Sequence, residues 1–110
     1  MTTVFKTKLV NELGTTPETV LTSSSSATTT VIGLSLANLT QSIILASVRL
    51  HDTVNDTMAY YSKDIIIPPN QSLRVVNGGE RLVVGPSTAL IVSANTEASI
   101  DLVLSYVEIS

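Results

Sequence analysis

Alternation of apolar and polar residues with a period of two is the feature that most constrains the fold of this chain. In the segment 100–109, IDLVLSYVEI, Ile100 and Leu102 share one face of an extended strand. The same alternation recurs at 31–38 and 42–52, in stretches rich in the β-branched residues that favour strands. No segment holds an apolar stripe with the 3.6-residue helical period over three turns. The pattern therefore predicts a chain built of strands.

Turn residues between the apolar runs set the number of expected strands. Pro68 and Pro69 end one run because proline cannot donate to a ladder, and Gly78 and Gly79 indicate a hairpin turn. The remaining breaks leave candidate strands at 3–11, 18–22, 31–38, 42–52, from Tyr60 to Pro68, 72–77, 80–84, 87–95 and 98–109. Short strands at this spacing are typical of sandwiches and jelly rolls.

The expected fold is all-β: one antiparallel β-sandwich or jelly-roll-like domain of about eight strands over residues 1–110. The segments 31–38 and 42–52 are expected to pair as a hairpin closed near Asn38 to Gln41. Residues 1–17 have two interpretations, as the first strand with its loop or as an extended N-terminal arm.

Composition excludes several classes of partner. The net charge is −3, and the six Lys and Arg residues are scattered, so we expect no direct binding of nucleic acid. Cysteine is absent, which removes disulfides, thiolate metal sites and thiol nucleophiles. The N-terminus lacks the apolar core of a signal peptide, and no apolar run approaches the roughly 20 residues that span a bilayer. We expect no membrane partner and synthesis in the cytoplasm.

The sequence offers little for catalysis or metal binding. The single histidine, His51, precedes Asp52, but adjacent residues on a strand point to opposite faces, so the two would not form part of a triad. Asp52 and Asp56 beside one histidine are too few for a zinc or calcium site and are ordinary turn residues. Tyr60 and Tyr61 would face opposite sides of a strand rather than form a stacking platform. We expect no enzyme activity, no cofactor and no metal.

Apolar surface is the remaining signal. Hydrophobic residues make up 44% of the chain and charged residues only 14%, and monomers usually avoid large apolar patches. With Ile100 and Leu102 in the core, Val103, Val107 and Ile109 face outward, which makes them the candidate oligomer interface. A neighbouring subunit would cover them, or else a second sheet or the N-terminal strand of the same chain.

The chain also resembles a family. Three segments carry the likeness: VIGLSLANLTQSIILASVRLHD from Val31, then DIIIPPNQSLRVVNGGERLVVGPSTALIVSAN, then IDLVLSYVEI. From Val31 to the C-terminus this order is similar to small virion proteins of tailed bacteriophages, especially capsid decoration or cement proteins. The chain departs from the pattern at Gly85 and Pro86, where glycine followed by an acidic residue is expected.

The resemblance implies a virion protein that reinforces the head shell through symmetric contacts. Such proteins are commonly trimers that bind the major capsid protein or other virion proteins, and the resemblance implies neither cofactor nor active site. Two alternatives stay open. One is a tail, neck, baseplate or fibre-adaptor component, and the other is a carbohydrate-binding module of a fibre, which would need exposed aromatics or a calcium loop near Asp52 to Asp56.

Overall fold

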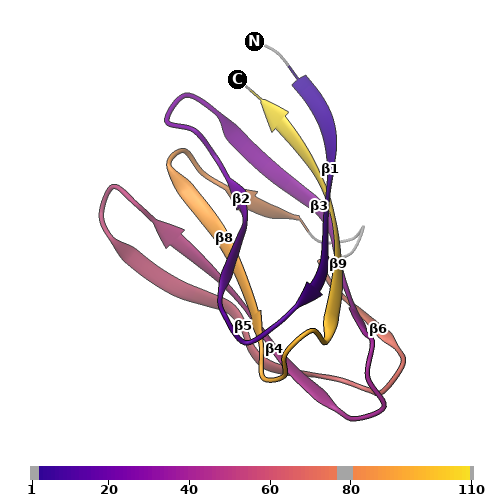
Figure 1. Ribbon diagram of the computed structural model, residues 1–110. Helices are drawn as coiled ribbons and strands as arrows, with labels where there is room; N and C mark the ends of the chain where they lie inside the picture. Colours follow the sequence, from indigo (N-terminus) through magenta and orange to yellow (C-terminus); the bar gives the residue numbers. More distant parts are fainter. Residues whose placement is uncertain (1–2, 77–80, 110) are drawn as a thin grey trace.

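Within the described residues, nine strands form two antiparallel sheets that pack face to face in the computed structural model (Figure 1). The structure describes residues 3–76 and 81–109, and no helix occurs within these ranges. The strands are β1 (Thr3–Leu13), β2 (Glu18–Thr22), β3 (Thr28–Asn38), β4 (Ile44–Asp52), β5 (Thr57–Ile67), β6 (Ser72–Val76), β7 (Leu82–Val84), β8 (Thr88–Ala94) and β9 (Ile100–Ile109). The two packed antiparallel sheets confirm the predicted all-β sandwich.

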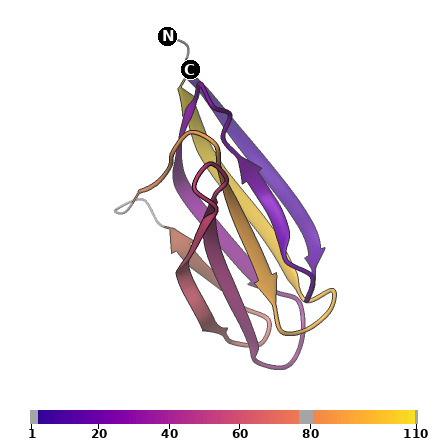
Figure 2. The ribbon, with the colours of Figure 1, turned by 90° about the vertical axis from the view of Figure 1, so that its left-hand side faces the viewer.

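Strands that are neighbours within a sheet are mostly not neighbours in the sequence. Sheet A has the order β1-β9-β3-β6, with β7 pairing to the start of β3, and sheet B has the order β2-β8-β4-β5. Both layers are seen in Figure 2, where the sandwich is turned by 90°. Only β4 and β5 are both consecutive in the chain and hydrogen-bonded to each other. Most strand pairs therefore join segments that are far apart in the sequence.

The predicted hairpin between 31–38 and 42–52 is wrong. The first segment belongs to β3 in sheet A and the second to β4 in sheet B, so the chain crosses from one sheet to the other. Both strands have buried apolar faces, and those faces meet across the core instead of lying side by side in one sheet. Asn38, only 3% exposed, holds the crossing because its Nδ2 donates to the carbonyl oxygens of Ser42, Ile67 and Pro68.

The core lies between the inner faces of the two sheets. In β9 the predicted alternation is confirmed, since Ile100, Leu102 and Leu104 are buried. In β4 the same is true of Ile44 and Ala46. The largest fully buried side chains are Leu13, Leu34, Leu36, Ile44, Ile67, Leu90, Ile100, Leu102, Leu104, Val31, Val48 and Val76.

One irregularity in β3 changes the outer surface. The sequence pattern predicts Ile32 on the same face as Leu34, but the register with β9 shifts between Val31 and Gly33. An extra residue in a strand reverses the inward and outward order beyond it. Val31 and Leu34 are therefore both buried, while Ile32 is half-buried and lines a hollow on the outside of the sheet.

The N-terminal segment is part of sheet A. Within residues 1–17, for which an extended arm was one interpretation, β1 pairs with β9 from Thr3 opposite Ile109 to Val10 opposite Leu102. The start of β1 and the end of β9 consequently lie at the same end of the molecule (Figure 1). The turn predicted at Gly78 and Gly79 lies outside the described residues.

Candidate assembly surface

The outer face of sheet A carries the residues predicted to form an interface. Along β9, Leu102 and Leu104 point into the core, whereas Val103 between them is 45% exposed. Val107 and Ile109 lie further along the strand and are half-buried. The strand period thus places these three residues as the sequence pattern indicates, and their contact with another subunit stays a prediction.

Strand β1 extends this apolar surface. Phe5 lies opposite Val107 and Leu9 lies opposite Val103, and directly opposed residues of an antiparallel pair share a face. Phe5 is 74% exposed and Leu9 is 68% exposed. We call the five residues Phe5, Leu9, Val103, Val107 and Ile109 the sheet A stripe. It runs over two neighbouring strands, and the period-two pattern of residues 98–109 does not indicate its β1 members.

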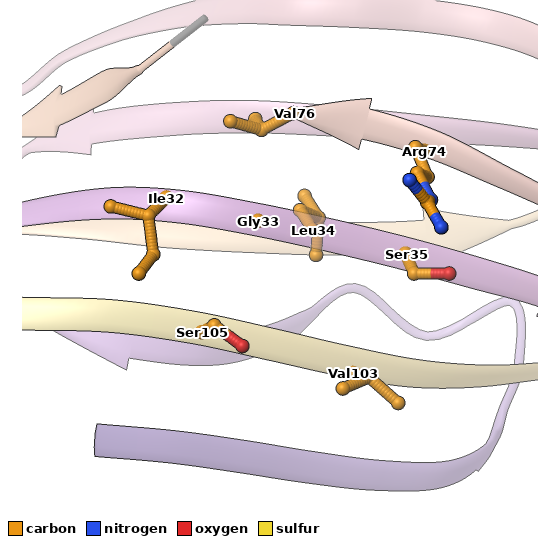
Figure 3. Close-up of a pocket in the computed structure, with 8 residues that line it drawn as sticks. All are labelled: Ile32, Gly33, Leu34, Ser35, Arg74, Val76, Val103 and Ser105. Atoms are coloured by element: carbon orange, nitrogen blue, oxygen red, sulfur yellow. The ribbon is translucent and has the colours of Figure 1, made fainter. Parts of the chain in front are cut away.

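A hollow of about 230 Å³ lies beside the stripe on the same sheet (Figure 3). Arg74, Ser35 and Val103 form one row across β6, β3 and β9, and Gly33 lies opposite Ser105 in the next row. A Cβ added to Gly33 would come no closer than 4.0 Å to its neighbours, so the missing side chain contributes to the hollow. Within the described residues no carboxylate forms an ion pair with Arg74.

A second hollow, of about 370 Å³, is lined by Leu9 and Val103 together with Asp101. The Asp101 carboxylate is partly engaged, because its Oδ1 accepts a hydrogen bond from the backbone N–H of Glu12 at 3.0 Å. Val103 lines both hollows, so the outer face of sheet A is uneven rather than flat. Such a surface has room for side chains of a second molecule.

The free edges of the two sheets differ in regularity. Strand β1 keeps an unbroken register with β9 over residues 3–10, and its own register shift lies beyond them, between Val10 and Leu13, with Glu12 at a positive φ of 52°. The register of β2 with β8 shifts between Thr19 and Leu21. The register of β5 with β4 shifts twice near Val48, and Asp64 of β5 has a positive φ of 52°. On the remaining side, β6 has five residues and β7 three. Bulges and short strands protect a sheet edge, so β1 is the open edge of the described structure.

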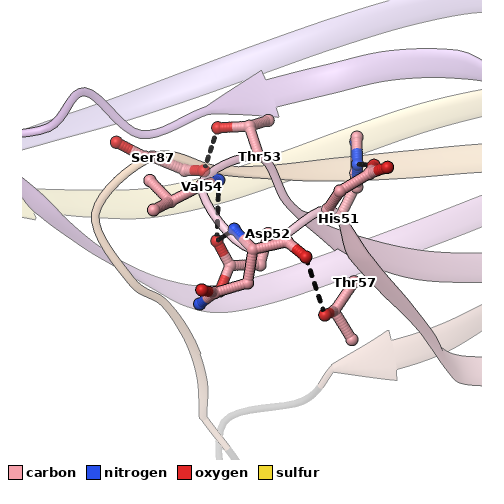
Figure 4. Close-up of polar contacts among 8 residues, drawn as sticks. His51, Asp52, Thr53, Val54, Thr57 and Ser87 are labelled. Atoms are coloured by element: carbon pink, nitrogen blue, oxygen red, sulfur yellow. Dashed lines mark hydrogen bonds and ion pairs between the residues drawn. The ribbon is translucent and has the colours of Figure 1, made fainter.

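The only histidine of the sequence, His51, lies at the end of β4, next to the turn between β4 and β5 (Figure 4). His51 Nε2 lies 2.9 Å from Asp56 Oδ1, and the Asp56 side chain is 91% exposed. Asp52 points elsewhere: its Oδ1 accepts the backbone N–H of Val54 at 3.0 Å and its Oδ2 accepts the side-chain N–H of Asn55 at 3.0 Å. The hydrogen bonds from Asn55 hold the pKa of Asp52 below its usual value.

These contacts close the turn. The two carboxylates have different partners, and the described residues hold no group of three His, Asp or Glu side chains arranged to bind a metal. Thr53 ties the turn to the rest of sheet B, because its hydroxyl donates to the carbonyl oxygen of Ser87 at 2.6 Å. The pair of tyrosines is also divided, since Tyr60 is 51% exposed and Tyr61 packs against the core.

Sequence comparisons identify no relative. No protein-family model matches the chain, and no curated protein matches it in sequence. The described residues also contain no helix with the length and apolar character that crossing a membrane requires.

A comparison of structures finds a protein of the same fold. A chain from Bacillus endospore appendages, described as forming a novel family of disulfide-linked pili, superposes with a TM-score of 0.59. The match covers 99% of the present chain and 88% of the other, at 12% sequence identity. This likeness shows the fold alone.

The expected function is corrected by that comparison. We expected a bacteriophage capsid cement protein, with other virion parts as alternatives, but the similar structure belongs to a bacterial pilus and not to a phage capsid. The resemblance rested on short strand and turn segments such as IPP and Gly-Gly. Segments of this kind recur in unrelated sandwiches because they encode turns and buried strands.

Proposed function

We propose that this protein is a structural subunit that assembles with copies of itself into a larger, non-covalent structure of the filament type. The observation that carries the proposal is the sheet A stripe, in which Phe5 and Leu9 are exposed beside Val103. Scattered exposed apolar residues are ordinary, but here two apolar pairs, Phe5 with Val107 and Leu9 with Val103, share one face of two paired strands on either side of the polar pair Thr7 and Ser105. Such a grouping indicates a surface that a partner covers.

The size of the surface is adequate for such a contact. Specific interfaces bury on the order of 800 Å² per partner, which is about an eighth of the 6032 Å² accessible to solvent here. We expect a second copy to cover the outer face of sheet A together with its β1 edge. Because Arg74 beside the stripe has no acidic partner within the described residues, it is available to a carboxylate of a neighbouring copy.

The likeness to an endospore pilus protein favours a filament over a closed ring. The chemistry of linkage must differ from the disulfides attributed to that protein, because the present sequence contains no cysteine. Assembly would depend on burial of apolar area and on strand edges, repeated over many identical copies.

The test replaces Leu9 with aspartate, which places a charge in the stripe on an edge strand where the side chain is already 68% exposed. Val54→Asp is the matched control, because Val54 is 75% exposed in the turn between β4 and β5, away from the stripe. We expect wild-type protein and the Val54 variant to form oligomers in sedimentation and negative-stain images. The Leu9 variant should be mainly monomeric.

Circular dichroism and thermal unfolding would check that both variants keep the wild-type fold. Wild-type protein that remains monomeric at about 100 µM, well above the Kd of ordinary specific interfaces, would contradict the proposal. Equal assembly of the Leu9 variant and the wild type would contradict the choice of surface. Val103→Asp provides a second position in the same stripe on the neighbouring strand.

A further inference from the structure

The open edge of β1 raises the question of what prevents it from pairing with another β1. An edge strand presents unpaired N–H and C=O groups, which form a template for a strand from another chain. Residues 3–10 of β1 offer such a template without a bulge, a proline or a glycine. Two copies related by a two-fold axis perpendicular to the sheet would pair β1 with β1 in antiparallel orientation.

The side chains on the inner face of β1 are the relevant ones. Lys6 lies opposite Tyr106 and Lys8 lies opposite Leu104, so both lysines belong to the face that is turned toward sheet B. Both residues are nevertheless exposed. Lys6 Nζ lies 3.4 Å from Glu108 Oε1, whereas no carboxylate of the described residues pairs with Lys8.

The possible registers follow from the strand period. The two-fold axis keeps the outer faces on the same side, so each residue pairs with one of its own face, and the two paired residue numbers sum to an even number. Within residues 3–10, two registers align seven residues: 3–9 with 3–9, where the sum is 12, and 4–10 with 4–10, where it is 14. These are the longest symmetric pairings that the regular part of β1 permits.

Both of these registers set lysine against lysine. With a sum of 12, Lys6 faces Lys6 of the second copy, and with a sum of 14, Lys6 faces Lys8 of the second copy twice. Like charges directly opposite each other destabilise a strand pair. The outer face raises no such obstacle, because in the second register Phe5 faces Leu9, an aromatic–aliphatic pair of the kind that stabilises sheets.

We infer that Lys6 and Lys8 are a charge guard that bars β1 from pairing with β1 of another copy, and thereby keeps this edge for a different strand of a neighbouring copy. The inference rests on the proposed function. A symmetric β1 contact would join the same surface of two copies and close the assembly at a dimer. Contacts between unlike surfaces let a chain of subunits grow, so the guard favours head-to-tail growth over a dead-end dimer.

The decisive variant is Lys8→Glu, studied in a Val103→Asp background that disables the proposed stripe contact. In the register with a sum of 14, the new carboxylate at position 8 faces Lys6 of the second copy, and the pair occurs twice. The pairing of Lys6 with Glu108 within one copy is left in place. Exchanging two repulsive pairs for two attractive ones should strengthen dimerisation by about tenfold or more. Sedimentation equilibrium would measure this change, and the effect should decrease with added salt.

Three further variants in the same background isolate the charge. Lys6→Glu combined with Lys8→Glu restores like charges across the axis, so this protein should return to the monomer. Lys6→Glu alone is its control, because it loses the same pair with Glu108 but sets a carboxylate against Lys8 of the second copy, and it should dimerise. Lys8→Gln removes the repulsion without adding an attraction, and it should dimerise less than Lys8→Glu. Both substituted positions are exposed, and circular dichroism would verify the fold.

A Lys8→Glu protein no more dimeric than its Val103→Asp parent would overturn the guard. Equal dimerisation of the single and double glutamate variants would do the same, because charge would then not be the cause. The outcome is separate from that of the proposed function, which is decided by wild-type assembly and by Leu9→Asp. If the wild type does not assemble, the charge series still reports whether β1 is guarded.

Discussion

Removal of the Asn38 side chain is expected to destabilise the fold more than any surface substitution. Its carboxamide connects three segments at the crossing between the sheets, where Nδ2 lies 2.8 Å from the carbonyl oxygen of Ser42, 3.0 Å from that of Ile67 and 3.1 Å from that of Pro68. Its Oδ1 accepts from both the backbone N–H and the hydroxyl of Thr40, each at 2.8 Å.

The expected loss in the free energy of unfolding depends on which of these carbonyl groups water can reach after Asn38→Ala. The contact with Ile67 is buried, whereas those with Ser42 and Pro68 are partly buried and open to solvent. One unsatisfied buried group costs about 1–3 kcal/mol, and a replaced hydrogen bond about 1 kcal/mol. We therefore expect a loss of about 2–4 kcal/mol, which for a domain of this size lowers Tm by roughly 10–25 °C.

Urea unfolding followed by far-UV circular dichroism would measure this loss. Asn11→Ala is the control, because Asn11 is exposed on β1 and a surface substitution of this kind changes stability by no more than about 0.5 kcal/mol. A loss below about 1 kcal/mol for Asn38→Ala would refute the reasoning, since the crossing would then not depend on the buried amide.

Two other substitutions test local features of the fold. Thr15 donates its hydroxyl and its backbone N–H to Glu97, and these hydrogen bonds lower the pKa of that carboxyl. The lowered pKa stabilises the fold above about pH 4.3. This contribution is lost as the pH falls through the lowered pKa. Glu97→Gln should flatten this acid-side decline in stability, and urea titrations between pH 2 and 7 would reveal an unchanged slope if the idea is incorrect. Gly33→Ala should leave Tm unchanged or raise stability by about 0.5–1 kcal/mol, because the added Cβ meets its neighbours at 4.0 Å and the φ of Gly33 is not positive. A clear loss in calorimetry would show that the hollow is closed in solution.

The buried face of an individual strand could be predicted from the sequence, because it depends on the two-residue period of side chains along that strand. In β9 the alternation places Leu102 inward and Val103 outward without any knowledge of neighbouring strands. The same reasoning fails wherever the period is interrupted. Ile32 turns outward because β3 contains an extra residue relative to β9. Gly33 is the one residue at this bulge that could have indicated it in the sequence.

Strand pairing could not be predicted in the same way. The segments 31–38 and 42–52 are neighbours in the chain and carry a turn between them, which favours a hairpin, yet they fold into different sheets. At the crossing, the buried side chain of Asn38 binds backbone carbonyl groups that a distant strand end supplies. A sequence pattern does not show which carbonyls will be close to a given amide.

The candidate surface shows the same division between local and long-range information. Val103, Val107 and Ile109 were identified from one strand, but Phe5 and Leu9 join them only because β1 pairs with the opposite end of the chain. A local signal for them did exist. Phe5 and Leu9 alternate with Lys6 and Lys8, so in an extended strand these apolar and charged side chains lie on opposite faces.

Both faces of β1 therefore bear on assembly, and they do so in opposite senses. The outer face, with Phe5 and Leu9, favours association because it exposes apolar area, and it would do so equally for symmetric and asymmetric contacts. The inner face, with Lys6 and Lys8, distinguishes between these contacts because charge repulsion depends on which residues lie opposite each other. A strand with only the first property would form closed dimers or aggregate, and a strand with only the second would have no reason to associate. Their combination on alternate residues of one edge strand is what makes directional growth from this edge physically reasonable.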